Sequence, residues 1–161
     1  MTRIHAQYHV GLKILLERDG KILFLKTATS NLWDFPGGRI DDVEHTVPLV
    51  DILAREISEE LGPDLKYQLG KPVIHFRRTY KKRIEPKRHE MASADLRSLS
   101  EDFRQNIFIV MFEAEYVSGE IVISDEHESL EWLDPKITKF KKEDFLSEEE
   151  FEALEDYFKI G

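Results

Sequence analysis

The sequence predicts a mixed α/β (α+β) fold in which a β-sheet is packed between helices. Two observations predict it: apolar, strand-like runs separated by Gly and Pro turns lie on both sides of one amphipathic helical segment, and a second helical segment closes the chain. The 161 residues are 41% hydrophobic and 34% charged, which is typical of a globular protein with a proper core. We therefore expect a single domain over residues 1–161, with a polar insertion at about 81–106.

The first strands are predicted as a hairpin. Residues 6–17 are rich in strand formers, Asp19 and Gly20 form a turn signal, and residues 22–25 predict a buried return strand. Residues 27–31 are loop-like. Residues 35–38 then combine a rigid proline with two permissive glycines.

The middle of the chain predicts a helix that starts near Thr46 or Pro48 and ends at Leu61, because Gly62 and Pro63 prevent its continuation. Its expected apolar face consists of four residues: Val50, Ala54, Ile57 and Leu61.

Three carboxylates share another face of this helix, because Glu56, Glu59 and Glu60 stand at i, i+3 and i+4. Like charges at i, i+4 repel by roughly 0.2–0.5 kcal/mol per pair. They also crowd the negative end of the helix. Such a cluster predicts a compensating cation, and hard oxygen ligands suit Mg²⁺ or Mn²⁺.

The second half predicts further strands and a final helix. A strand over 66–79 is broken at 70–72, the polar insertion carries a short helix around 91–104, and the strongest strand runs from 107 to 112 and on to 117. A turn at 118–120 leads into a strand at 121–123, and an acidic loop at 124–128 precedes the apolar segment 130–133. The last helix starts at Ser147, where Glu150 completes a capping box, and it presents Phe151, Leu154 and Phe158 on one side.

Composition excludes several classes of protein. There are no cysteines for disulfides or a thiolate zinc site, no apolar run long enough for a bilayer, and no apolar secretory leader at the N-terminus. These absences favour a cytoplasmic protein. The net charge of −9 disfavours general nucleic-acid binding, although residues 77–88 carry +6 and the remainder therefore carries −15.

Residues 33–62 resemble the signature of the Nudix hydrolases. Gly38 and Glu44 have the spacing of its first half, residues 55–62 match its second half without a gap, and the run 33–37 is also typical of the family. Ten residues separate Glu44 from Arg55 where the family pattern has seven. We expect the three additional residues in the loop before Pro48, with His45 or Thr46 as alternative occupants of the place of Glu44.

The resemblance implies a Nudix-like α/β/α sandwich with a mixed sheet that hydrolyses a diphosphate bridge, a phosphorus-containing anhydride. It implies Mg²⁺, with Mn²⁺ as the alternative, held by the Gly37 carbonyl and by Glu56, Glu59, Glu60 and Glu126. Arg55 would orient the carboxylates, Glu44 would pair with Arg55, and the general base stays open between Glu56 and Glu126. Asp125 and Glu128 are rivals of Glu126.

The implied substrate is a small nucleotide: a modified nucleoside triphosphate or a nucleotide sugar first, ADP-ribose or a dinucleoside polyphosphate second. Arg77 or Arg78 would reach its phosphates, and Tyr80 or Phe76 would stack on its base. The alternative interpretation of residues 77–88 is a solvated basic hairpin without a binding role. Contact with an RNA 5′ end is less favoured than either substrate binding or the solvated hairpin. Three histidines, His75, His89 and His127, match no histidine metal motif.

Two alternatives stay open at this point. The insertion 81–106 suits a substrate lid, a mobile loop or a dimer contact, so a homodimer is compatible with the sequence. The rival function is a Nudix-like module that binds a nucleotide or a protein and no longer cleaves.

Overall fold

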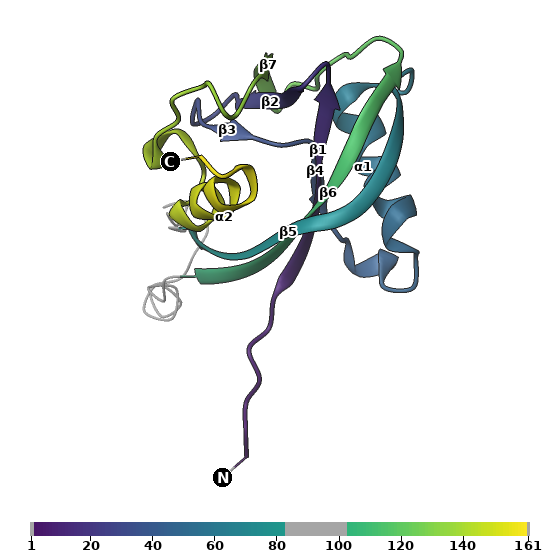
Figure 1. Ribbon diagram of the computed structural model, residues 1–161. Helices are drawn as coiled ribbons and strands as arrows, with labels where there is room; N and C mark the ends of the chain where they lie inside the picture. Colours follow the sequence, from purple (N-terminus) through teal and green to yellow (C-terminus); the bar gives the residue numbers. More distant parts are fainter. Residues whose placement is uncertain (1, 83–102, 161) are drawn as a thin grey trace, which may run out of the picture.

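A computed structural model describes residues 2–82 and 103–160, and the side chains of residues 80–82, 103 and 104 lie outside that description. A mixed sheet passes between two helices (Figure 1). Its strands are β1 (His9–Arg18), β2 (Lys21–Thr27), β3 (Trp33–Asp34), β4 (Gly37–Arg39), β5 (Lys66–Lys82), β6 (Phe103–Ser118) and β7 (His127–Leu133). The helices are α1 (Leu49–Leu61) and α2 (Glu148–Phe158), with short 3₁₀ turns η1 (Asp42–Glu44) and η3 (Lys142–Asp144).

Strand β1 lies at the centre of the sheet. It pairs in parallel with β6 from His9 to Glu17, while its other edge is shared between β2 at the hairpin end and β4 at residues 11–13. Strand β2 leaves β1 immediately after the hairpin and pairs instead with β3 and β7 (Figure 1). The backbone of residues 36–39 therefore occupies the edge of β1 that β2 vacates, where Ile14 N donates to Pro36 O at 2.9 Å.

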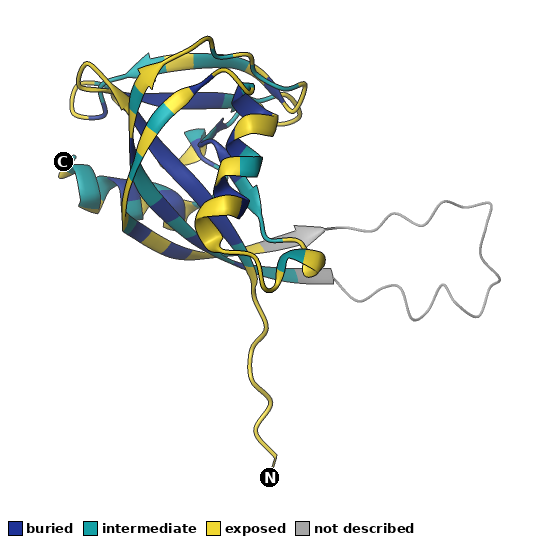
Figure 2. Ribbon diagram, turned by 90° about the vertical axis from the view of Figure 1, so that its right-hand side faces the viewer, coloured by how far each residue is buried: buried dark blue, intermediate teal, exposed yellow. Residues whose placement is uncertain are grey.

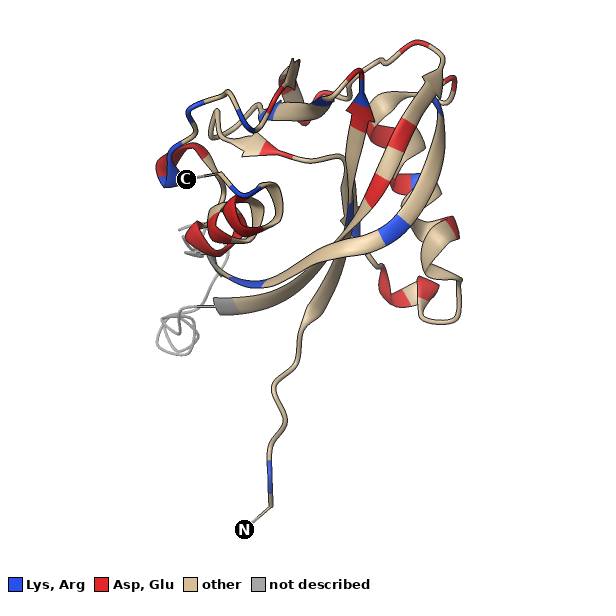
Figure 3. Ribbon diagram, in the orientation of Figure 1, with Lys and Arg blue, Asp and Glu red and all other residues tan. Residues whose placement is uncertain are grey.

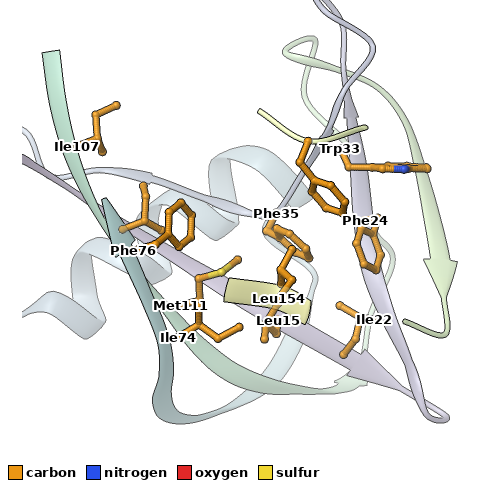
Figure 4. Packing of buried hydrophobic residues seen from close by; sticks show 12 residues of the cluster. Leu15, Ile22, Phe24, Trp33, Phe35, Ile74, Phe76, Ile107, Met111 and Leu154 are labelled. Carbon is orange, nitrogen blue, oxygen red and sulfur yellow. The ribbon is translucent and has the colours of Figure 1, made fainter. Parts of the chain in front are cut away.

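Both faces of β1 are buried, which its nearly continuous apolar run explains. Leu12, Ile14 and Leu16 pack with the α1 residues Leu53 and Ile57 on one face. On the other face, the core contains Leu15, Phe24, Phe35, Met111 and the α2 residue Leu154 (Figure 4). Figure 2 shows the buried strands between the exposed outer sides of the chain. The predicted sheet between helices is confirmed.

Most predicted elements are confirmed. Asp19 and Gly20 both have positive φ, 54° and 76°, which is the geometry of a tight two-residue hairpin. Helix α1 begins one residue after Pro48 and ends before Gly62, whose φ is 90°. The pairing of β5 with β6 shifts register between Leu69 and Ile74, at the predicted break.

The predicted apolar face of α1 is partly wrong. Val50 and Ala54 are exposed, and Ile52 and Leu53 are buried in their place. Leu53, Ile57 and Leu61 define the buried stripe at i, i+4 spacing, and Ala54 lies one residue further, about 100° round the helix.

The predicted strand at 121–123 is wrong. This segment instead runs along the C-terminal end of α1, where Val122 N donates to Leu61 O at 2.9 Å and Ser124 N donates to Glu60 O at 3.0 Å. It satisfies helix carbonyls that have no partner within the helix. The return strand comes later, as β7, which begins at His127 inside the predicted acidic loop and pairs with β2.

The ends of the predicted insertion are also different. Strand β5 extends to Lys82 and β6 begins at Phe103, so residues 81–82 and 103–106 are strand, and the predicted helix at 91–104 is wrong for its last two residues. The rest of that helix and His89 lie outside the described residues. At α2, Ser147 Oγ accepts from Glu150 N at 3.2 Å, but the Glu150 side chain is buried against Arg78 rather than completing the capping box.

Replacing Leu53 with alanine should lower the free energy of unfolding by about 2–5 kcal/mol, because its fully buried side chain leaves a cavity between α1 and the sheet. Urea denaturation measures the change. Val50→Ala is the matched control on the same helix, since Val50 is exposed, and it should change the stability by less than about 0.5 kcal/mol. Equal losses from the two variants would contradict the packing described for α1.

Candidate active site

Arg55 organises the acidic face of α1. Its guanidinium donates to Glu59 Oε1 and Oε2 at 3.2 and 3.1 Å and to Glu56 Oε1 at 2.9 Å. Figure 3 shows this helix with its acidic bands beside the centre of the sheet. A guanidinium is planar and carries five donors, so one side chain can fix two neighbouring carboxylates at once.

Glu44 pairs with Arg55 despite the three additional residues between them. Arg55 Nε donates to Glu44 Oε1 at 2.7 Å and Arg55 Nη2 donates to Glu44 Oε2 at 2.9 Å, a two-pronged ion pair. This pairing lowers the pKa of Glu44, helped by the backbone N–H of Asp41. The extra residues lie between η1 and α1, as expected, and neither His45 nor Thr46 takes the place of Glu44.

Glu56 lies against the backbone of Gly38. A Cβ at position 38 would collide with the Glu56 carboxylate, so only glycine leaves room for this approach. Burial raises the pKa of Glu56, although the adjacent Arg55 opposes the rise. The Glu56 carboxylate thus lies close to the β4 backbone while it accepts from Arg55.

Glu60 is the most buried of the three helix carboxylates, with 8% of the residue exposed. Its Oε2 accepts from Gly37 N at 2.8 Å. Burial raises the pKa of Glu60 to about 7, against the opposing effects of Lys13 and of the Gly37 amide. Gly37 itself has φ of 138°, and a Cβ there would collide with Leu12 O, so this donor depends on glycine.

An open cleft of about 470 Å³ lies next to Glu60. Its wall contains acidic residues from three parts of the chain, namely Asp34, Glu60, Asp125 and Glu126, together with His127 and residues 27–29. The structure thus brings Glu126 to the same cleft as Glu60. Of the predicted rivals, Asp125 lines the cleft as well, whereas Glu128 is absent from its lining.

No sequence pattern indicated two further buried polar groups: His127, which lines this cleft, and Lys13, which contacts the lining residue Asp34. Lys13 lies in an apolar strand, yet its Nζ donates to Asp34 Oδ1 at 2.6 Å and to Phe35 O at 2.9 Å. Burial opposes its charge, but the carboxylates of Asp34 and Glu60 prevail and raise the pKa of Lys13. His127 is buried, its Nδ1 has no partner among the described residues, and burial lowers its pKa.

The predicted substrate-binding residues are not part of this cleft. The Arg78 side chain is instead directed to α2, where its Nη1 donates to the fully buried Glu150 Oε2 at 3.4 Å. Arg77 is exposed and lines a separate cleft of about 530 Å³ with Tyr8, Phe76 and acidic residues of α2. The backbone of Tyr80 belongs to β5, but its side chain lies outside the described residues.

The residues present fit a hard divalent ion by their chemistry. Glu56, Glu59 and Glu60 supply oxygen donors, and Gly38 leaves space that a side chain would fill. Within residues 2–82 and 103–160, no three acidic or histidine side chains converge as a ready-made metal site. The carboxylates are instead held by Arg55 and by the Gly37 amide.

A family model described as the NUDIX domain matches residues 7–154. No curated protein matches the sequence. Solved structures match the fold: a UDP-X diphosphatase (TM-score 0.61, 15% identity, 98% of this chain and 66% of that one), a MutT NUDIX hydrolase from Burkholderia pseudomallei (0.58, 23%, 93% and 98%), and an ADP-ribose pyrophosphatase from Streptococcus suis (0.59, 15%, 95% and 91%). This chain thus spans just under two thirds of the UDP-X diphosphatase. In the part of the chain that is described, no helix is long and apolar enough to span a membrane.

Glu150 should make stability fall as pH rises. Its burial raises its pKa to about 7 from a usual value of 4.5, so the folded protein binds more protons than the unfolded chain between these values. The stabilisation is complete below about pH 4.5 and is lost as pH rises through about 7. Glu150→Gln should remove this part of the pH dependence in urea denaturation, and Glu149→Gln, at an exposed neighbour, should retain it. Parallel pH profiles for Glu150→Gln and the wild type would contradict this prediction.

Proposed function

This chain belongs to the Nudix family, and from that premise we propose that it is a Mg²⁺- or Mn²⁺-dependent hydrolase that breaks the diphosphate bridge of a nucleoside diphosphate derivative. The observation that carries the proposal is the carboxylate face of α1, which Arg55 orders and which meets the glycine backbone of β4. We further propose that residues 1–161 form one domain, which the family match over 7–154 supports.

The proposed metal ligands are Glu56, Glu59 and Glu60, with Glu126 and the Gly37 carbonyl completing the set. A divalent ion would neutralise the negative diphosphate and lower the pKa of water. Arg55 supports this arrangement by holding Glu56 and Glu59 in place, and Glu44 in turn orients Arg55. Arg55 is fully engaged with carboxylates, which supports an orienting role without substrate contact.

The general base stays open between Glu56 and Glu126. Glu56 lies close to the β4 glycines, and burial raises its pKa. Glu126 is exposed and lines the cleft beside Glu60. Either carboxylate could accept a proton from an attacking water.

The proposed substrate is a modified nucleoside triphosphate or a nucleotide sugar, with ADP-ribose and dinucleoside polyphosphates as second choices. Matches to a UDP-X diphosphatase and a MutT protein support this range of chemistry without selecting within it. Of the two arginines proposed to contact phosphate, Arg78 is already paired with Glu150. Arg77 remains the proposed phosphate contact, through the cleft that it lines beside α2.

The rival proposal is a module that binds a nucleotide or a protein and does not cleave. Its only support was the longer spacing between Glu44 and Arg55, and the intact ion pair between these residues counts against it. A panel of nucleoside diphosphate derivatives, incubated with Mg²⁺ or Mn²⁺ and scored for phosphate-containing products, distinguishes the two. We expect turnover of at least one member, and a protein that binds members of the panel but cleaves none would favour the rival.

Replacing Glu60 with glutamine should lower turnover on the best member of the panel at least about tenfold, since losing a metal ligand costs no less than losing an outer-shell partner. The fold should persist, because the amide fills the same space and needs no counter-charge. Turnover and urea denaturation are measured side by side. Asp51→Asn, at an exposed acid on the same helix, is the control and should retain wild-type turnover. Full activity of Glu60→Gln would refute the assignment.

Replacing Gly38 with alanine should also abolish most turnover, because the new Cβ would displace the Glu56 carboxylate. Gly20→Ala serves as the comparison: Gly20 has positive φ, so alanine should cost stability there, but a Cβ meets nothing within 4 Å and turnover should be kept. If Gly38→Ala turned over substrate like the wild type, a close approach of Glu56 to β4 would not be needed for the reaction.

A further inference from the structure

Lys13 is the one lysine among the described residues that is buried, with 6% of the residue exposed. Its neighbours Leu12 and Ile14 pack on the α1 face of the sheet, so the alternation of a strand directs Lys13 to the opposite face. A buried ammonium is unfavourable unless it is paired and hydrogen-bonded. The burial of Lys13 therefore requires partners that compensate its charge.

The partners of Lys13 are two consecutive residues. Nζ donates to the side chain of Asp34 at 2.6 Å and to the carbonyl of Phe35 at 2.9 Å. Phe35 N in turn donates to the same Asp34 oxygen at 2.8 Å. One ammonium thus fixes both the side chain and the backbone of the chain as it leaves β3.

The segment fixed in this way leads directly to the donor that holds Glu60. Lys13 lies opposite Gly37 in the pairing of β1 with β4, and Ile14 N donates a hydrogen bond to Pro36 O. Gly37 N then donates to Glu60 Oε2 at 2.8 Å. Lys13 anchors the start of this four-residue segment, and the strand pairing anchors its end.

We propose that Lys13 is a positioning residue for the reaction: it holds the segment 34–37 so that the Gly37 amide stays on the Glu60 carboxylate. The role in turnover rests on the function proposed above, whereas the effect on Gly37 does not. A buried ion pair is often no more stabilising than apolar residues of similar size, so stability alone gives little reason for a lysine inside this strand. Asp34 also lines the cleft beside Glu60, which places the ion pair next to the site it would organise.

The competing explanation is that Lys13 only neutralises Asp34. Lys13→Met would then be harmful because it leaves a buried carboxylate unpaired, and Lys13→Met combined with Asp34→Asn would repair every defect. The positioning role predicts a different result for the double variant, because Met cannot donate to the Phe35 carbonyl even when no charge is left unpaired.

The test is hydrogen exchange of the Gly37 amide, measured by NMR on the full ¹⁵N-labelled chain. In Lys13→Met and in the double variant we expect exchange at least about tenfold faster than in the wild type, because the segment opens locally. The Gly62 amide, which donates to Ser58 O at 3.1 Å within the C-terminal end of α1 and does not contact the segment 34–37, is the internal control and should keep its rate. If Lys13→Met fails to fold, the double variant alone decides.

The double variant also separates positioning from stability. Its urea midpoint should return close to that of the wild type, because no buried charge is left unpaired, while kcat on the best substrate should stay about tenfold or more below that of Asp34→Asn, with KM within about twofold. Wild-type exchange at Gly37 in the double variant overturns the proposal, as does fast exchange with undiminished kcat. If the wild type cleaves no substrate, the function proposed above fails, and the exchange of Gly37 still decides whether Lys13 holds the segment.

Discussion

The concentration of negative charge on one face of α1 is the constraint to which the rest of the site responds. Three glutamates within five residues repel one another near the negative end of the helix dipole. Two groups offset this repulsion. The Arg55 guanidinium donates to Glu44, Glu56 and Glu59, and the backbone amide of Gly37 donates to Glu60. Glu44 orients the Arg55 guanidinium, and Gly37 supplies the amide that binds Glu60. The acidic face is therefore held in place by elements that come before it in the chain.

The divergence of β2 from β1 makes this arrangement possible. A hairpin that stayed paired along its length would cover the edge of β1 and leave no place for the glycine backbone of β4. Because β2 turns away to join β3 and β7, residues 36–39 reach the centre of the sheet and lie beneath α1. The same divergence leaves Asp34, which pairs with Leu25 of β2, in position to accept from Lys13. Topology, rather than local sequence, thus creates the meeting point of helix, glycines and buried lysine.

Local patterns predicted what depends on neighbours in sequence. The Asp19–Gly20 turn, the extent of α1 and the shared face of its glutamates follow from turn chemistry and helical spacing, which need no tertiary information. Contacts across the fold were beyond such patterns. The sequence pattern does not show that α2 places Glu150 against Arg78. It also does not show that residues 121–123 hydrogen-bond to the end of α1 instead of forming a strand. Lys13 resembled any strand lysine, because its partner lies 21 residues away.

The hydrogen bond from Ser124 N to Glu60 O joins two parts of the wall of the cleft beside Glu60. It ties the helix that carries Glu60 to the short loop that carries Asp125 and Glu126, and all three acidic residues line the same cleft. The facing loop, residues 27–29, is attached to the same acidic segment, because Ala28 N donates to Glu126 O at 3.0 Å. The parts of this wall are thus joined by main-chain hydrogen bonds, which do not depend on which side chains occupy positions 27–29.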